Sequence, residues 1–105
     1  MSVFVSVEDR DGEPLVEAFE ADAVCGRFPR DAGNFLRYAG AAEDASFNLM
    51  QAPGFMAELE AFAEKVQGGL DDEGRKELGK LMAACRKWKN SRYAHLRFYS
   101  EGGRE

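Results

Sequence analysis

The stretch that decides the fold of this chain is PGFMAELEAFAEKVQGGLDDEGRKELGKLMAACRKW, residues 53–88. Its first part, 53–67, places apolar side chains at helical spacing and opens with Pro53, which suits a first helical position. Its second part, from about 71 to 88, has acids in the first turn and bases in the last, the order that the helix dipole favours. A short Gly-Gly connection ends the first helix, so we expect two antiparallel neighbouring helices.

The N-terminal part of the sequence predicts a β-hairpin. Valines alternate with other residues over 3–7, as in a strand with one buried face. An Asp-Gly pair at 11–12 is a strong turn signal, and 14–20 returns as a second strand. In that strand, strict alternation places Val16 and Phe19 on opposite faces.

The remaining segments complete the predicted topology. A short helix begins near Asp22, the segments 34–39 and 46–50 predict a second hairpin, and 93–100 alternates as a strand with one buried face. The element order is ββ(α)ββααβ. Such an order favours an α+β fold in one domain, with an antiparallel sheet of four to five strands and two antiparallel helices on one face. We expect the tail 101–105 to fray.

The charge of the chain is divided unevenly along its length. Residues 1–73 carry 16 Asp or Glu and five Lys or Arg, whereas 74–105 carry three acids and nine bases, within a net charge of −5. A split of this size points to a charged partner or to neutralisation within the fold.

Several function classes find no support in the sequence. No apolar run is long enough for a membrane span, and the N-terminus lacks the pattern of a signal peptide, so we expect a cytoplasmic protein. Cys25 and Cys85 lie 60 residues apart, which fits no zinc motif, and we expect reduced thiols with Cys85 in the core. The chain has one histidine and no phosphate-binding glycine motif. We therefore expect no metal and no cofactor.

Catalysis by a nucleophile would depend on His95, because it is the only imidazole base in the chain. A pair formed by Cys25 and His95 is the arrangement that the residue types allow, although the sequence does not place the two side chains together. Alternating acids near the first turn resemble the spacing of calcium ligands. That loop is too short for an EF-hand and lacks the distal glutamate, so we interpret it as a solvated turn.

Two surfaces are candidates for binding a partner. The basic run RKWKNSRY, 86–93, alternates cations with aromatics, but its Trp88 lies on the apolar side of the predicted helix, and the acidic remainder of the chain disfavours nucleic acid. The first candidate is instead the acidic set Asp9, Asp11, Glu13, Glu17, Glu20, Glu43 and Asp44. The second is the solvent-facing row of the last strand, which consists of types enriched at binding hot spots: Tyr93, His95, Arg97 and Tyr99.

Three segments resemble a group of small uncharacterised bacterial proteins: NFLRYAGAAEDASFNLMQ (34–51), MAELEAF (56–62) and AHLRFYSEG (94–102). In that group, an aromatic strand leads to a loop ending in Asp-x-x-Phe-Asn, an acidic Leu-rich helix follows, and a late strand ends in Phe-Tyr-x-(Asp/Glu)-Gly. The resemblance implies a shared fold. In size and acidity the chain is also similar to bacterial immunity proteins, which neutralise toxins.

These observations predict a non-enzymatic protein-binding module, of the kind found among immunity proteins and antitoxins. The partner would be a protein, and a basic toxin fits the acidic surface because opposite charges steer association. One alternative is a small enzyme or ligand-binding domain with a pocket between sheet and helices. Another is a homodimer or larger homo-oligomer with a regulatory role, built through an exposed sheet face or edge.

Overall fold

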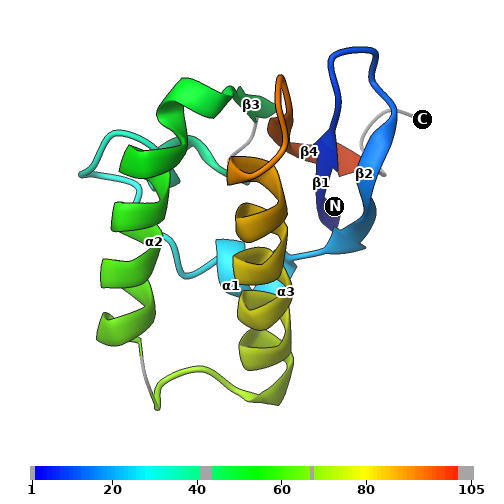
Figure 1. The fold of residues 1–105 in the computed structure, drawn as a ribbon. Helices are drawn as coiled ribbons and strands as arrows, with labels where there is room; N and C mark the ends of the chain where they lie inside the picture. Colours follow the sequence, from blue (N-terminus) through cyan, green and yellow to red (C-terminus); the bar gives the residue numbers. More distant parts are fainter. Residues whose placement is uncertain (1, 41–43, 67, 102–105) are drawn as a thin grey trace.

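The computed structural model describes residues 2–40, 44–66 and 68–101, and it has two layers (Figure 1). An antiparallel four-stranded sheet carries two main helices on one face, which confirms the predicted α+β architecture. The elements, in chain order, are β1 (Ser2–Glu8), β2 (Pro14–Glu20), α1 (Asp22–Cys25), the 3₁₀ turn η1 (Leu36–Tyr38), β3 (Ala45–Phe47), the 3₁₀ turn η2 (Leu49–Gln51), α2 (Ala52–Lys65), α3 (Asp72–Lys89) and β4 (His95–Glu101).

The sheet has the strand order β2-β1-β4-β3, so its central pair joins the first and the last strand. Val3 pairs with Ser100 and Val7 with Leu96, in a continuous antiparallel register. The alternation predicted for both strands is confirmed, because Val5 and Val7 on β1 and Leu96 on β4 have no exposed surface. One face of this central pair is therefore core, and the other is turned away from the helices.

The first hairpin forms as predicted around its Asp-Gly turn. The Asp9 carboxylate accepts hydrogen bonds from the backbone N–H groups of Asp11 and Glu13, both at 2.9 Å. Gly12 adopts a φ of +86°, a conformation that a side chain would oppose. These local bonds close the turn without help from the rest of the molecule.

Strand β2 departs from strict alternation, because its register against β1 shifts. Val5 pairs with Phe19 while Val7 pairs with Val16, so β2 holds one residue more than β1 over this interval. Such a bulge moves Val16 and Phe19 to the same side, and both pack partly against the core. The prediction that they face opposite ways is wrong for this reason.

Helices α2 and α3 stand side by side and run in opposite directions, and α1 lies behind α3 (Figure 1). Asp71 caps α3 by accepting a hydrogen bond from the N–H of Gly74 at 2.8 Å. The core between helices and sheet is aromatic: the Phe55 ring lies 5.6 Å from that of Trp88 and 5.9 Å from that of Phe98. Cys85 is fully buried beside them, as predicted.

The second predicted hairpin does not form. Residues 34–39 contain η1 instead of a strand, and only Ala45–Phe47 of the following segment is a strand, paired with β4. Two side chains from outside the segment bind the backbone groups that a strand ladder would use. Glu58 of α2 accepts from the N–H groups of residues 34, 35 and 36, and Arg30 donates to the carbonyls of residues 36, 37 and 39. With those groups satisfied, the segment packs as an irregular loop.

The last strand begins later and ends later than predicted. Tyr93 lies before β4, in a turn in which the N–H of Ala94 donates to the carbonyl of Ser91 at 3.2 Å. At the other end Glu101 pairs with Ser2, so the predicted frayed tail does not include it. The rest of that tail lies outside the described residues.

Candidate protein-binding surface

The sheet face turned away from the helices is the first candidate surface. It is formed by the alternate residues of the two central strands, which we call the open face: Phe4, Ser6 and Glu8 of β1, with His95, Arg97 and Tyr99 of β4. Each is opposite a neighbour on the facing strand, as Phe4 is opposite Tyr99 and Ser6 opposite Arg97. Their core-facing neighbours pack under the helices, so these six side chains point the other way.

Arg97 lies at the centre of the open face and is held there by two carboxylates. Its Nη1 atom lies 3.2 Å from Oε2 of Glu8, and its Nη2 atom lies 4.0 Å from Oδ2 of Asp44. The hydroxyl of Ser6 donates to the same Glu8 oxygen at 3.1 Å. The Arg97 side chain is still 42% exposed. The guanidinium is therefore held in one orientation within the fold, and part of the side chain remains accessible.

Aromatic rings extend this cluster along the strands. The rings of Phe4 and Tyr99 stack with their centroids 5.9 Å apart and an angle of 25° between planes. The guanidinium carbon of Arg97 lies 4.5 Å from the Tyr99 centroid, within the range of a cation–π contact. His95 is half-buried at the start of β4, opposite Glu8. Three residues of the predicted row, His95, Arg97 and Tyr99, are thus brought together on one face.

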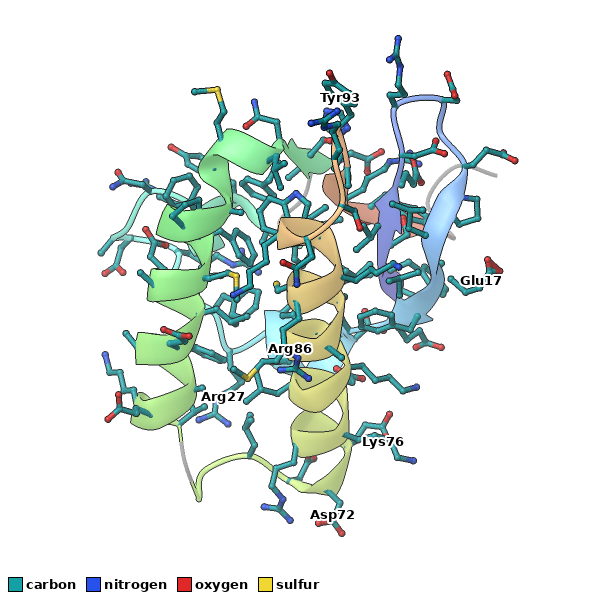
Figure 2. All side chains as sticks on the ribbon, in the orientation of Figure 1. Glu17, Arg27, Asp72, Lys76, Arg86 and Tyr93 are labelled. Atoms are coloured by element: carbon teal, nitrogen blue, oxygen red, sulfur yellow. The ribbon has the colours of Figure 1, made fainter. Side chains whose placement is uncertain are left out.

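Tyr93, the fourth residue of that predicted row, lies apart from the other three. It has a φ of +62°, the only positive φ outside glycine in the part of the chain that the structure describes. The residue is 57% exposed, and the guanidinium carbons of Arg10 and Arg92 lie 5.4 and 5.9 Å from the centroid of its ring. Figure 2 shows it at the end of the molecule, beyond the last turn of α3. A left-handed conformation is strained for a residue with a bulky side chain.

The predicted acidic set is divided among three places. Glu17 and Glu20 are exposed on β2, and Glu17 points away from the body of the molecule (Figure 2). Asp11 and Glu13 are exposed in the hairpin turn, whereas the Asp9 carboxylate is occupied in closing that turn.

Asp44 lies at the opposite side of the sheet, beyond β4, where it also accepts a hydrogen bond from the N–H of Ser100 at 3.3 Å. Glu43 lies outside the described residues. The acids therefore flank the open face from both edges and do not form one patch.

Two further carboxylates have internal roles that the sequence analysis did not identify. Glu77 is buried on α3 and accepts a hydrogen bond from the N–H of Val24 in α1 at 3.0 Å. Burial raises the pKa of Glu77 above its ordinary value, and the bonds from the backbone of α1 oppose that shift. A signal was present, because an acid at 77 falls on the same helical face as the apolar 81, 84 and 88. The sequence gives no comparable signal for Glu58, since this residue lies beside the apolar face of α2 and not on it.

The geometry separates Cys25 from His95. A side chain on Gly40 would collide with Cys25 and touch Val3, so the cysteine lies near the Val3–Ser100 pair. His95 is five residues from Ser100 along β4, roughly 16 Å at the rise of a strand. Burial also raises the pKa of the Cys25 thiol to about 12, which suppresses the thiolate. The pair does not form a catalytic dyad.

The interior between sheet and helices bears on the predicted alternatives of a ligand pocket and of a nucleic-acid surface. Phe55, Trp88 and Phe98, all without exposed surface, fill the central space between sheet and helices. At one edge of that space a surface hollow remains between β2 and α3, where Val16, Phe19 and Lys80 are among the lining residues. Burial of Trp88 removes one of the two aromatics of the basic run from any stacking role, whereas Tyr93, the other, is exposed. Within the described ranges, no three His, Cys, Asp or Glu side chains gather as metal ligands.

Comparison with protein-family models, curated proteins and solved structures finds no match for this chain. Over the part of the chain that is described, no helix is both long enough and apolar enough to cross a membrane.

Proposed function

We propose that this protein is a non-enzymatic binding module that recognises another protein through the open face of its sheet. The observation that carries the proposal is the position of Arg97, which is oriented by Glu8 and Asp44, stacked against Tyr99 and left partly exposed. Arginine and tyrosine side chains that are already ordered lose little entropy on binding and are the types that dominate interface energies.

The acids around this face favour a basic partner. Glu17 and Glu20 line one edge of the sheet and Asp44 the other, while Arg97 is already matched by carboxylates. A negative rim accelerates association with a positive surface and suppresses acidic competitors. An inhibitor of a basic bacterial toxin, acting in the cytoplasm as an immunity protein or antitoxin, fits this arrangement, and the size and acidity of the chain support it.

The test begins with capture of partners from a native cytosolic extract on the immobilised protein, followed by binding kinetics with the captured protein. Arg97→Ala and Tyr99→Ala remove the centre of the open face, so we expect each to increase the dissociation rate by about tenfold or more. Glu17→Gln with Glu20→Gln removes the rim, so we expect a slower association rate and a weaker salt dependence.

The matched control is Glu60→Gln with Glu64→Gln, which removes the same charge from the exposed side of α2. It should leave the kinetics of complex formation close to those of the unmodified protein. A partner that binds the Arg97→Ala and Tyr99→Ala variants as tightly as the original protein would refute the open face as the contact surface.

A homodimer through β2 is a second candidate, because this seven-residue strand forms one edge of the sheet. A symmetric antiparallel pairing of two β2 strands centred on Glu17 would place that residue opposite its own copy, which like-charge repulsion opposes. We therefore expect a monomer. Light scattering at two protein concentrations distinguishes the two states, and a mass that doubles with concentration would favour the dimer.

A further inference from the structure

A hollow on the surface lies between α2 and the segment 27–36. Its volume is about 590 Å³, within the range of small-molecule sites. Leu36 and Phe62 are buried side chains that reach its wall, and Val66 adds a half-buried one. The T-shaped contact between Phe28 and Phe62, with centroids 4.9 Å apart, supports this wall from behind. The hollow thus has a firm apolar floor.

The one carboxylate that lines the hollow is already occupied. Both oxygens of Glu58 accept backbone hydrogen bonds: Oε2 from Asn34 at 2.7 Å, and Oε1 from Phe35 at 3.2 Å and Leu36 at 3.0 Å. These three bonds hold the loop 34–36, which forms one wall of the hollow, against α2. They direct both oxygens of Glu58 towards the loop backbone, although the carboxylate keeps its charge and about one further acceptor position.

Two cations at one end of the hollow have no carboxylate partner within the described ranges. Arg27 is exposed and uses one N–H to hold the carbonyl of Gly69 at 2.9 Å, which fixes the position of the side chain. Lys65 is exposed in the last turn of α2 and forms no ion pair with any described residue. Figure 2 shows Arg27 beside the C-terminal end of α2. The helix dipole accounts for a base at Lys65, but not for Arg27, which comes from a different segment.

We propose that this hollow binds a small amphipathic carboxylate. The apolar body of the ligand would lie on Leu36, Phe62 and Val66, and its carboxylate would lie between Arg27 and Lys65. A guanidinium matches a carboxylate in two parallel hydrogen bonds, and a lysine adds a second positive charge without competing for the same geometry. The open face of the sheet takes no part, so this site is independent of the proposed protein partner.

The test uses octanoate as probe, with octanol and octylamine as analogues that keep the chain and change the head group. Titration of the full-length protein is followed by amide NMR shifts, and affinity by calorimetry. We expect saturable octanoate shifts around Arg27, Leu36 and Lys65. Octanol should bind about tenfold more weakly because it lacks the charge, and octylamine should bind more weakly still.

Three variants locate the site. Lys65→Met should weaken octanoate binding by about tenfold, and Ala61→Phe, which adds bulk at an exposed lining position, should abolish it without removing a charge. Lys76→Met removes an equally exposed cation from α3 and should leave the affinity unchanged. Arg27→Met also removes the bond to Gly69, so its effect is compared only after its melting temperature has been measured.

The proposal would be overturned if octanoate gave no saturable shift at these residues up to millimolar concentration, or if octanoate and octylamine bound equally. An undiminished affinity in the Ala61→Phe variant would overturn it as well. Because the variants leave Arg97 and the β2 acids intact, failure here leaves the protein-binding proposal standing, and failure of that proposal leaves this one standing.

Discussion

Glu58→Gln is the substitution that tests most directly how the loop 34–36 is held. It preserves the shape of the side chain but replaces one acceptor oxygen by an NH₂ group and removes the charge. Asn34, whose N–H donates to Oε2 at 2.7 Å, would then face a donor, while Phe35 and Leu36 would keep a weaker, neutral acceptor. A hydrogen bond to a charged group contributes about 1.5–3 kcal/mol, and here water can replace part of the loss at the exposed Asn34. We expect the free energy of unfolding to fall by about 2 kcal/mol, which lowers the melting temperature by roughly 8–16 °C for a domain of this size.

Urea denaturation and thermal melting measure this loss, and amide hydrogen exchange locates it. Exchange at Asn34, Phe35 and Leu36 should accelerate beyond what the global change in stability accounts for, since these amides lose their acceptors first. The control is Glu64→Gln on the exposed side of the same helix, which should change stability by no more than about 0.5 kcal/mol. The reasoning would be refuted if Glu58→Gln were no more destabilising than Glu64→Gln.

Three further outcomes follow from the structure. Because burial raises the folded-state pKa of Glu77 above its ordinary value of 4.5, its contribution to stability is complete below that value and is lost as pH rises through the raised pKa. In urea titrations, the stability advantage of the unmodified protein over Glu77→Gln should therefore fall between about pH 4 and pH 7. An advantage that does not change with pH would contradict the raised pKa of Glu77. Tyr93→Gly should be about 0.5–1 kcal/mol more stable than Tyr93→Ala, since both lack the ring and only alanine keeps the left-handed strain; equal denaturation midpoints would argue against it. Burial raises the pKa of both Cys25 and Cys85 to about 12, so a thiol reagent at pH 8 should react with them only after urea unfolds the chain. Rapid labelling of the native protein would show that a thiol is accessible.

Local sequence patterns were sufficient to predict the elements that pair with a neighbour in the chain and the elements whose apolar residues recur at a regular spacing. The helices α2 and α3, the hairpin closed by Asp9 and the alternation of β4 all belong to this kind. Each is specified by the spacing of apolar residues or by a turn that satisfies its own backbone groups.

The errors in the fold prediction arose where a side chain or strand outside the segment decided its conformation. Residues 34–39 have the composition of a strand, but Glu58 binds their N–H groups and Arg30 binds their carbonyls, and neither interaction has a local signature. The bulge in β2 is likewise a property of the pair of strands, so alternation within 14–20 misplaced Phe19.

The candidate surface was predicted in part, for a related reason. Residue type identified His95, Arg97 and Tyr99, and strand periodicity placed them on one face. Which carboxylates would meet Arg97 depended on strand order, which no local pattern specifies, so Glu8 was not among the candidates. Tyr93 was grouped with the strand because the alternation of apolar and polar residues extends to position 93. In the structure its backbone has a positive φ and belongs to the turn before β4.

The strand order β2-β1-β4-β3 has a consequence for how the protein is made. A ribosome delivers β1 first, yet β1 acquires its second neighbour only when His95–Glu101 has emerged, and β3 has no strand partner before then. Closing so long a loop is entropically slow compared with forming a helix or a hairpin. During synthesis the chain would thus hold two helices and one hairpin around an unfinished core, with Val5, Val7 and Phe47 lacking the strand that pairs beside them. Folding of the sheet is in this sense a late event, and a chain terminated before β4 should collect in aggregates instead of folding to a smaller version of the domain.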